Sequence, residues 1–246
     1  MPRVTLWRSS IVLKAAMAVS GLVLFGFVVG HMAGNLKAFQ GPDKLNAYAE
    51  WLREIGAPAL PHSSALWIAR VTLIVAVVVH VAAAVQLTIQ NRRARPKGYR
   101  ELQPVQLDYA SRTMRWSGFL ILAYVVYHLM HLTWGNVHPN FVHGDVYANL
   151  VTGLSQWPIA VAYMVANVLL GVHLYHGLWS MFQSLGLDHP AYRGARRPFA
   201  VVFAIVVTVG FLAVPVGVLT GWIEEPAATP ERAAAAASSA GPRSAE

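Results

Sequence analysis

The sequence predicts an all-α protein, an integral membrane bundle of five transmembrane helices. Two observations lead to this fold class. The chain of 246 residues is 56% apolar and only 12% charged, whereas about a quarter of the residues of a soluble domain are charged. The apolar residues are also gathered into long uninterrupted segments. A large part of the surface must therefore face something other than water.

Five segments are long enough to span a bilayer, whose core of about 30 Å requires roughly 20 mostly apolar residues in a helix. They cover residues 15–33, 65–90, 116–134, 157–182 and 199–222. The first is too long for the apolar part of a cleaved signal peptide, and no convincing cleavage pattern follows it. We therefore expect a five-helix transmembrane domain over residues 1–224 and a disordered Ala, Ser and Pro-rich tail over residues 225–246.

The distribution of lysine and arginine predicts the orientation. Three segments hold thirteen of the nineteen basic residues: the amino terminus (Arg3, Arg8, Lys14), the connection between spans two and three (Arg92, Arg93, Arg95, Lys97, Arg100, Arg112, Arg115) and the connection between spans four and five (Arg193, Arg196, Arg197). By the positive-inside rule these segments are cytoplasmic. The amino terminus is then inside and the carboxyl terminus outside, and the net charge of +8 needs no nucleic-acid partner.

The two connections on the outer side differ in pattern. Residues 34–64 contain an amphipathic stretch over residues 43–55, which predicts a helix lying along the membrane surface. Residues 135–156 are expected to form a loop. We find neither a strand pattern nor a reliable internal repeat.

Histidines supply the candidate chemistry. The chain has no cysteine, which excludes iron-sulfur ligation by this chain, thiolate zinc sites and haem attached through a CxxCH motif. Spans one to four nevertheless carry six histidines, His31, His80, His128, His131, His173 and His176. An ionisable side chain in a spanning helix costs a few kcal/mol and asks for a functional reason.

Their depths form two levels. At about 1.5 Å per residue, His31 and His128 lie roughly 18 to 24 Å from the cytoplasmic face, and His80 and His173 lie roughly 8 Å from it. Each level takes one histidine from each of two helices, as two axial ligands of a haem require. Zinc would recruit more ligands at one centre, and no span contains Asp or Glu. Depth leaves open whether His131 or His176 replaces a neighbour or instead hydrogen-bonds a propionate, a carbonyl or a quinone.

Four segments resemble the single-polypeptide, two-haem cytochrome b subunit of succinate dehydrogenases and fumarate reductases. They are SGLVLFGFVVGHMAGN around His31, VVVHVAAAVQ around His80, SGFLILAYVVYHLMHLTW around His128 and HLYHGLWSMFQSLG from His173. The resemblance extends over about residues 9–222. It implies axial ligation of an outer haem b by His31 and His128, and of an inner haem b by His80 and His173.

The resemblance also implies roles for other residues. His131 and His176 are then not ligands. Lys14, Arg112 and Arg115 lie at the height of the inner haem propionates, although topology or headgroup anchoring is the simpler explanation of these three. Arg70 lies beside the outer haem, where a charge within an apolar run needs a partner. Some fumarate reductases have an acidic residue two positions before the fourth ligand, which is linked to proton movement. This chain has Gly171 there, which puts that proton path in doubt.

The family implies a multi-pass subunit of the bacterial plasma membrane. It anchors a flavoprotein and an iron-sulfur protein on the cytoplasmic side and passes their electrons to a membrane quinone, usually menaquinone. The chain itself shows no flavin motif, cluster ligands or succinate site, so succinate chemistry belongs to its partners in the respiratory chain and tricarboxylic acid cycle. The alternatives are the cytochrome b of a formate dehydrogenase or hydrogenase, whose partners lie outside, and a transporter with a histidine-lined path.

Overall fold

The computed structural model describes residues 9–94, 109–138, 140–187 and 189–225, and every regular element in these ranges is a helix. The helices are α1 (Ser10–Asn35), the 3₁₀ helix η2 (Leu36–Gln40), α2 (Pro42–Glu54), α3 (Ser64–Arg93), α4 (Tyr109–Leu132), α5 (Val146–Leu154), α6 (Trp157–Ser184) and α7 (Pro190–Leu219). The all-α prediction is confirmed. The predicted tail beyond residue 225 lies outside the described residues, as do Arg3, Arg8, Arg95, Lys97 and Arg100.

The long helices coincide with the predicted spans. Among the described residues, four segments are long and apolar enough to cross a membrane: α1 with η2, α3, α6, and α7 from Gly194. This is the architecture of a multi-pass membrane protein. Helix α4 overlaps the third predicted span but is not one of the four, so the fifth crossing stays a prediction.

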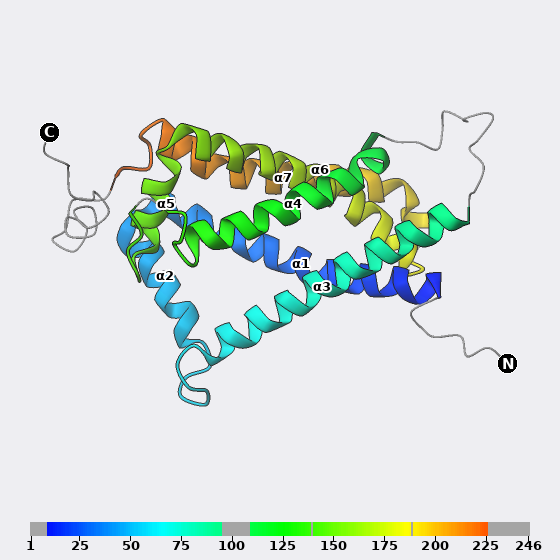
Figure 1. The fold of residues 1–246 in the computed structure, drawn as a ribbon, viewed down its shortest axis with the longest axis horizontal. Coiled ribbons are helices and arrows are strands. Elements are labelled where there is room, and N and C mark those ends of the chain that lie inside the picture. The colour runs from blue at the N-terminus through cyan, green and yellow to red at the C-terminus, as the bar shows by residue number, and fades with distance from the viewer. Residues whose placement is uncertain (1–8, 95–108, 139, 188, 226–246) are drawn as a thin grey trace, which may run out of the picture.

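The bundle has two distinct ends (Figure 1). One end carries α2 and α5 and is called here the α2–α5 end; the other is where α6 connects to α7, the α6–α7 end. Helix α6 packs chiefly on α4 and α7, while α3 packs chiefly on α1. Figure 1 shows α3 diverging from the other long helices toward α2, so the first half of α3 lies at the edge of the bundle.

The connection over residues 135–156 is not the loop that the sequence predicted. Val146–Leu154 forms α5, and seven of its nine residues are buried. The carboxylate of Asp145 accepts a hydrogen bond from the backbone N–H of Ala148 and so caps the helix, an arrangement that stabilises a helix start. A helix of nine residues is too short to be stable alone, and packing against its neighbours stabilises it.

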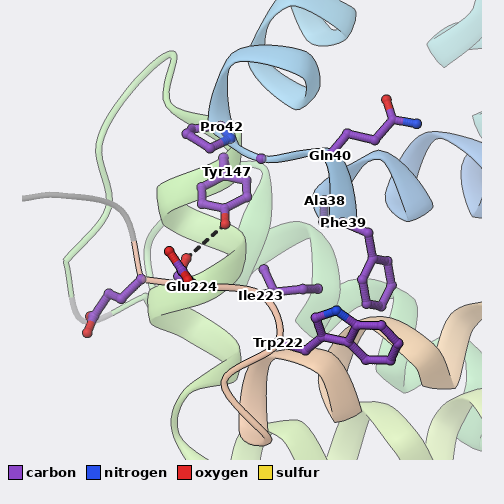
Figure 2. A pocket seen from close by; sticks show the side chains of 10 residues that line it. Ala38, Phe39, Gln40, Pro42, Tyr147, Trp222, Ile223 and Glu224 are labelled. Atoms are coloured by element: carbon purple, nitrogen blue, oxygen red, sulfur yellow. Dashed lines mark hydrogen bonds between the residues drawn. The ribbon is translucent and has the colours of Figure 1, made fainter.

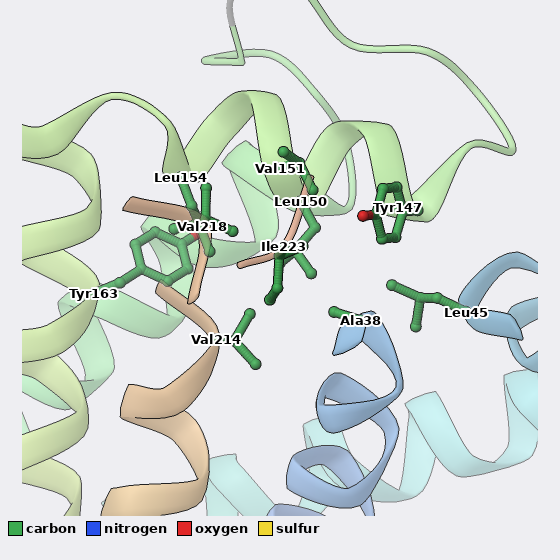
Figure 3. Packing of buried hydrophobic residues seen from close by; sticks show 10 residues of the cluster. All are labelled: Ala38, Leu45, Tyr147, Leu150, Val151, Leu154, Tyr163, Val214, Val218 and Ile223. Carbon is green, nitrogen blue, oxygen red and sulfur yellow. The ribbon is translucent and has the colours of Figure 1, made fainter. Parts of the chain in front are cut away.

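The largest apolar core lies at the α2–α5 end (Figure 3). There the buried side chains of Leu150, Val151 and Leu154 from α5 meet Val214 and Val218 from α7, with Ala38, Leu45, Tyr163 and Ile223 around them. Amphipathic α2 joins this core through Leu45, which is 4% exposed. The core therefore locks the end of α1, the start of α6 and the end of α7 together.

Two hydrogen bonds of Asn46, together called the polar clip, join α2 to α5 and provide a test of this arrangement. The Asn46 side chain donates to the Asp145 carboxylate and accepts from the Tyr147 backbone N–H, both at 3.0 Å. We expect Asn46→Ala to lower the free energy of unfolding by about 1–3 kcal/mol, because it leaves partly buried polar groups without partners. Heat-induced unfolding in detergent measures the change. Exposed Asn136 is the control, and an equal loss in Asn136→Ala would contradict the clip.

Candidate functional site: paired histidines at two levels

One histidine pair joins α3 to α6. The imidazole ring centroids of His80 and His173 lie 6.2 Å apart, with their planes inclined at 60°. Both side chains are half-buried. The two residues are 93 positions apart in the chain, so the fold, and not local sequence, brings them together.

Hydrogen bonding determines which nitrogen of His80 is available to a ligand. Its Nδ1 lies 3.1 Å from the backbone carbonyl oxygen of Met17 in α1. Because a carbonyl can only accept, Nδ1 carries the proton, and in the neutral ring Nε2 keeps its lone pair. A histidine whose second nitrogen donates to a carbonyl in this way is the usual arrangement of a metal ligand.

A second pair, called the upper pair, joins α1 to α4 nearer the α2–α5 end. His80 and His173 form the lower pair. The ring centroids of His31 and His128 lie 5.8 Å apart with an interplanar angle of 82°. Phe27 stacks on His31 at 5.1 Å, and Phe211 of α7 lies 6.0 Å from it. The Nδ1 atom of His128 is buried without a hydrogen-bond partner in the described structure.

The structure also gives the separation of the two levels. A Cβ built on Gly21 in α1 would lie 3.3 Å from Cε1 of His80, so Gly21 marks the lower level on the helix that carries His31. Ten residues separate Gly21 from His31, which corresponds to roughly 15 Å along the helix. The two pairs are therefore stacked along the bundle and do not form one cluster.

Each pair fits a metal held by two opposed imidazoles. Histidine nitrogens bind metals such as zinc at about 2.0–2.1 Å, and two imidazoles on opposite sides of an iron at a similar distance would have ring centroids roughly 6 Å apart. The observed separations of 5.8 and 6.2 Å match this geometry. A site of only two nitrogens leaves the other positions to a macrocycle, as in a bis-histidine haem.

His131 takes part in a separate polar cluster. It is fully buried, its Nδ1 is hydrogen-bonded to the Tyr163 hydroxyl at 2.8 Å, and its ring stacks on His138 at 4.9 Å. Nε2 of His138 donates to the Asn149 carbonyl at 2.8 Å, since that carbonyl can only accept. A side chain on Gly153 would collide with both rings, at 2.6 and 3.0 Å. The cluster holds α4, α5 and α6 together beside the upper pair.

The remaining predicted site residues are His176, Arg70, Lys14, Arg115 and Arg112. His176 contacts Trp179 of its own helix at 5.8 Å. Arg70 is exposed, with its guanidinium 4.9 Å from the ring of Trp67, and no described contact joins it to the upper pair. Lys14 and Arg115 are exposed near the α6–α7 end, and the side chain of Arg112 lies outside the described part of the chain.

Gly171 marks a close contact between α6 and α7. A Cβ at this position would collide with Oγ1 of Thr208. A side chain at this position would therefore require Thr208 or the two helices to shift, so the packing favours the glycine that this chain has.

Two functional residues were not predicted from the sequence. Tyr163 lies 5.8 Å from the His128 ring and also binds His131, while Arg196, expected only as a topological charge, is buried. A repeat also went unrecognised: Met, Ser, Gly, Val, Val and His recur with identical spacing over residues 17–31 and 114–128. Aligning the segments on the first and third histidines would have revealed it.

A shallow hollow of about 410 Å³ lies at the α2–α5 end, between η2, α5 and the end of α7. Figure 2 shows Phe39, Trp222 and Tyr147 around it, with the Tyr147 hydroxyl donating to the Glu224 carbonyl at 2.8 Å. Burial raises the pKa of Tyr147, so its hydroxyl stays a donor at neutral pH. None of the lining residues is a histidine.

Apolar spans that bring histidines together at two levels define a multi-helix membrane protein with paired intramembrane imidazoles. Residues 99–213 match the family of succinate dehydrogenase/fumarate reductase transmembrane subunits. The match extends over α4 and α6, with His128 and His173, and over α7 to Ala213. Over this part of the chain the match supports the resemblance found in the sequence. The comparisons with curated proteins and with solved structures gave no match.

His138, which lies beyond the spans, should make stability depend on pH. Burial lowers the pKa of His138 below 6.5, although its bond to the Asn149 carbonyl opposes this shift. As pH falls through 6.5, the unfolded chain binds a proton that the folded chain excludes, so this contribution to stability is lost on acidification. Unfolding midpoints between pH 7.5 and 5 should therefore fall less steeply in His138→Gln than in the wild type.

His143→Gln is the matched control, because His143 is an exposed histidine of the same connection. Its pH dependence should equal that of the wild type. Parallel curves for the wild type and His138→Gln would show that His138 is not responsible.

Proposed function

We propose that the chain is the membrane anchor and cytochrome b subunit of a bacterial succinate:quinone oxidoreductase. It carries electrons from a cytoplasmic iron-sulfur subunit, through two bis-histidine haems b, to a membrane quinone. The supporting observation is the pairing of His31 with His128 and of His80 with His173, each from two helices. The match to the transmembrane subunit family supports the same complex.

Individual side chains have separate roles that suit electron transfer. Haem b supplies reversible one-electron chemistry when it is bound between two imidazoles. The Met17 carbonyl holds the His80 ring in the tautomer that leaves Nε2 free to bind. Phe27 and Phe211 surround His31 with apolar rings and so limit the access of water. With both imidazoles engaged, such a haem would carry electrons and would have no position left for oxygen.

The arrangement of the two levels suits transfer between the faces of the membrane. The lower pair, toward the α6–α7 end, lies on the side where we place the cytoplasm, because Arg92, Arg93, Arg196 and Arg197 are found at that end. An iron-sulfur subunit docked there would meet the lower pair first. The quinone, which we expect to be menaquinone, is reduced within the membrane, and the flavoprotein partner oxidises succinate.

Haem content tests the proposal. The purified complex should show low-spin haem b in a redox difference spectrum at close to two per copy of this chain. His80→Ala and His173→Ala should each reduce this to about one, because a bis-histidine site with one imidazole lost does not retain its haem. His31→Ala and His128→Ala should remove the other haem, with a different spectral component lost.

His176→Ala is the matched control, because it removes an imidazole from the same face of α6 and should leave both haems in place. Loss of a haem in His176→Ala with none in His173→Ala would reverse the ligand assignment in α6. A wild-type complex that contains no haem after gentle isolation would refute the proposed function itself.

Locating the two chain ends tests the orientation of the helices and the side of the membrane on which the partner subunits bind. Cysteines placed at Ser9 and at Glu225 report the two ends of a chain that contains no other cysteine. In intact cells an impermeant thiol reagent should label Glu225→Cys and not Ser9→Cys, because the basic connections hold the amino terminus inside. The reverse labelling would place the partner subunits outside and favour the formate dehydrogenase or hydrogenase type.

A further inference from the structure

The repeat over residues 17–31 and 114–128 places one Met-x-x-Ser-Gly segment beside each histidine of the lower pair. Six residues recur at the same spacing: Met17, Ser20, Gly21, Val28, Val29 and His31 in α1 correspond to Met114, Ser117, Gly118, Val125, Val126 and His128 in α4. The final histidine of each copy belongs to the upper pair. The Met-x-x-Ser-Gly segment at the beginning of each copy lies beside a histidine of the lower pair.

In the first copy, three groups surround the His80 ring. The Met17 carbonyl oxygen and the Ser20 Oγ lie 3.1 and 3.4 Å from Nδ1. The Ser20 hydroxyl donates to the Ala16 carbonyl at 2.7 Å, which leaves an Oγ lone pair directed toward the imidazole. The missing side chain of Gly21 makes the approach possible, since a Cβ there would lie 3.3 Å from Cε1.

In the second copy the glycine lies beside His173. A Cβ on Gly118 would lie 3.6 Å from Cε1 and 4.0 Å from Nδ1 of His173. Ser117 is 2% exposed and donates to the Met114 carbonyl at 3.1 Å. The Nδ1 of His173 is buried and has no hydrogen-bond partner in the described structure. A buried ring nitrogen is expected to have a hydrogen-bond partner, and the Met114 carbonyl and the Ser117 hydroxyl stand at the positions equivalent to Met17 and Ser20 in the first copy.

We propose that the two Met-x-x-Ser-Gly segments hold the imidazoles of His80 and His173 in equivalent ways, and that Ser20 and Ser117 are positioning residues for these imidazoles. The Met17 carbonyl and the Ser20 oxygen lie within reach of the Nδ1 proton of His80, and we assign the Met114 carbonyl and the Ser117 oxygen the same role toward Nδ1 of His173. In both copies the glycine leaves room for the edge of the ring. Both Nε2 lone pairs then point at one centre. The inference rests on the proposed function, because it assigns these two segments to the ligands of the inner haem.

This assignment has a consequence that mere packing would not have. A hydrogen bond accepted from Nδ1–H makes the imidazole a more basic ligand and favours oxidised iron. Loss of either serine oxygen should therefore raise the reduction potential of the inner haem and leave that of the outer haem unchanged. Two residues 97 positions apart should act on the same haem and in the same direction.

The experiment is a potentiometric titration of the intact complex followed by optical and electron paramagnetic resonance spectra. The inner haem is the component that disappears in His80→Ala. We expect Ser20→Ala and Ser117→Ala each to shift this component to higher potential, and Ser20→Thr and Ser117→Thr, which keep the hydroxyl, to restore it. Ser180→Ala is the matched control, because Ser180 bonds back to the Gly177 carbonyl within its own helix.

A glycine variant keeps the test decisive if a serine variant fails to assemble. Gly118→Ala adds a methyl group at contact distance from the His173 ring and should change the resonance of the inner haem alone. Gly194→Ala is its control, since a Cβ there meets nothing within 4 Å. An unchanged inner haem in these variants, or a shift of the outer haem instead, would overturn the inference while two bound haems keep the proposed function intact. A wild type without haem would remove both.

Discussion

A polar side chain inside an apolar bundle needs a polar partner, and this constraint organises the centre of the molecule. His80 satisfies it through the Met17 carbonyl, and His131 through the Tyr163 hydroxyl. The rings of His31 and His128 lie side by side, as do those of His80 and His173, while Nδ1 of His128 and of His173 has no hydrogen-bond partner in the described structure. Each of these contacts joins different helices, so the imidazoles contribute to deciding which helices become neighbours.

The two levels make the halves of the chain depend on each other. The hairpin of α1 and α3 contributes His31 and His80, and α4 and α6 contribute His128 and His173. Each pair therefore takes one histidine from each half, so neither half can complete a pair alone. The Met-x-x-Ser-Gly segments are arranged in the same way. The segment in α1 lies beside His80 of α3, and the segment in α4 lies beside His173 of α6.

Glycines set how closely the helices approach around these pairs. A side chain at Gly171 would collide with Thr208, and one at Gly210 would collide with Met32, so α7 lies directly against α6 and α1. Gly153 does the same for the stacked rings of His131 and His138. Close backbone approach through small residues is how helices associate where lipid offers no hydrophobic driving force. The same packing favours the glycine at position 171.

The sequence by itself determined the helical class, the position of the long helices and the two depths of histidine, because length, hydropathy and the rise of a helix are local properties. It also predicted α2 from its amphipathic pattern. Only the tertiary structure decided that residues 146–154 form a helix, since their stability comes from burial against α7. It alone placed His131 against Tyr163 and gave His80 a carbonyl of α1. Such contacts join residues distant in the chain, and periodicity within one helix carries no information about its neighbours.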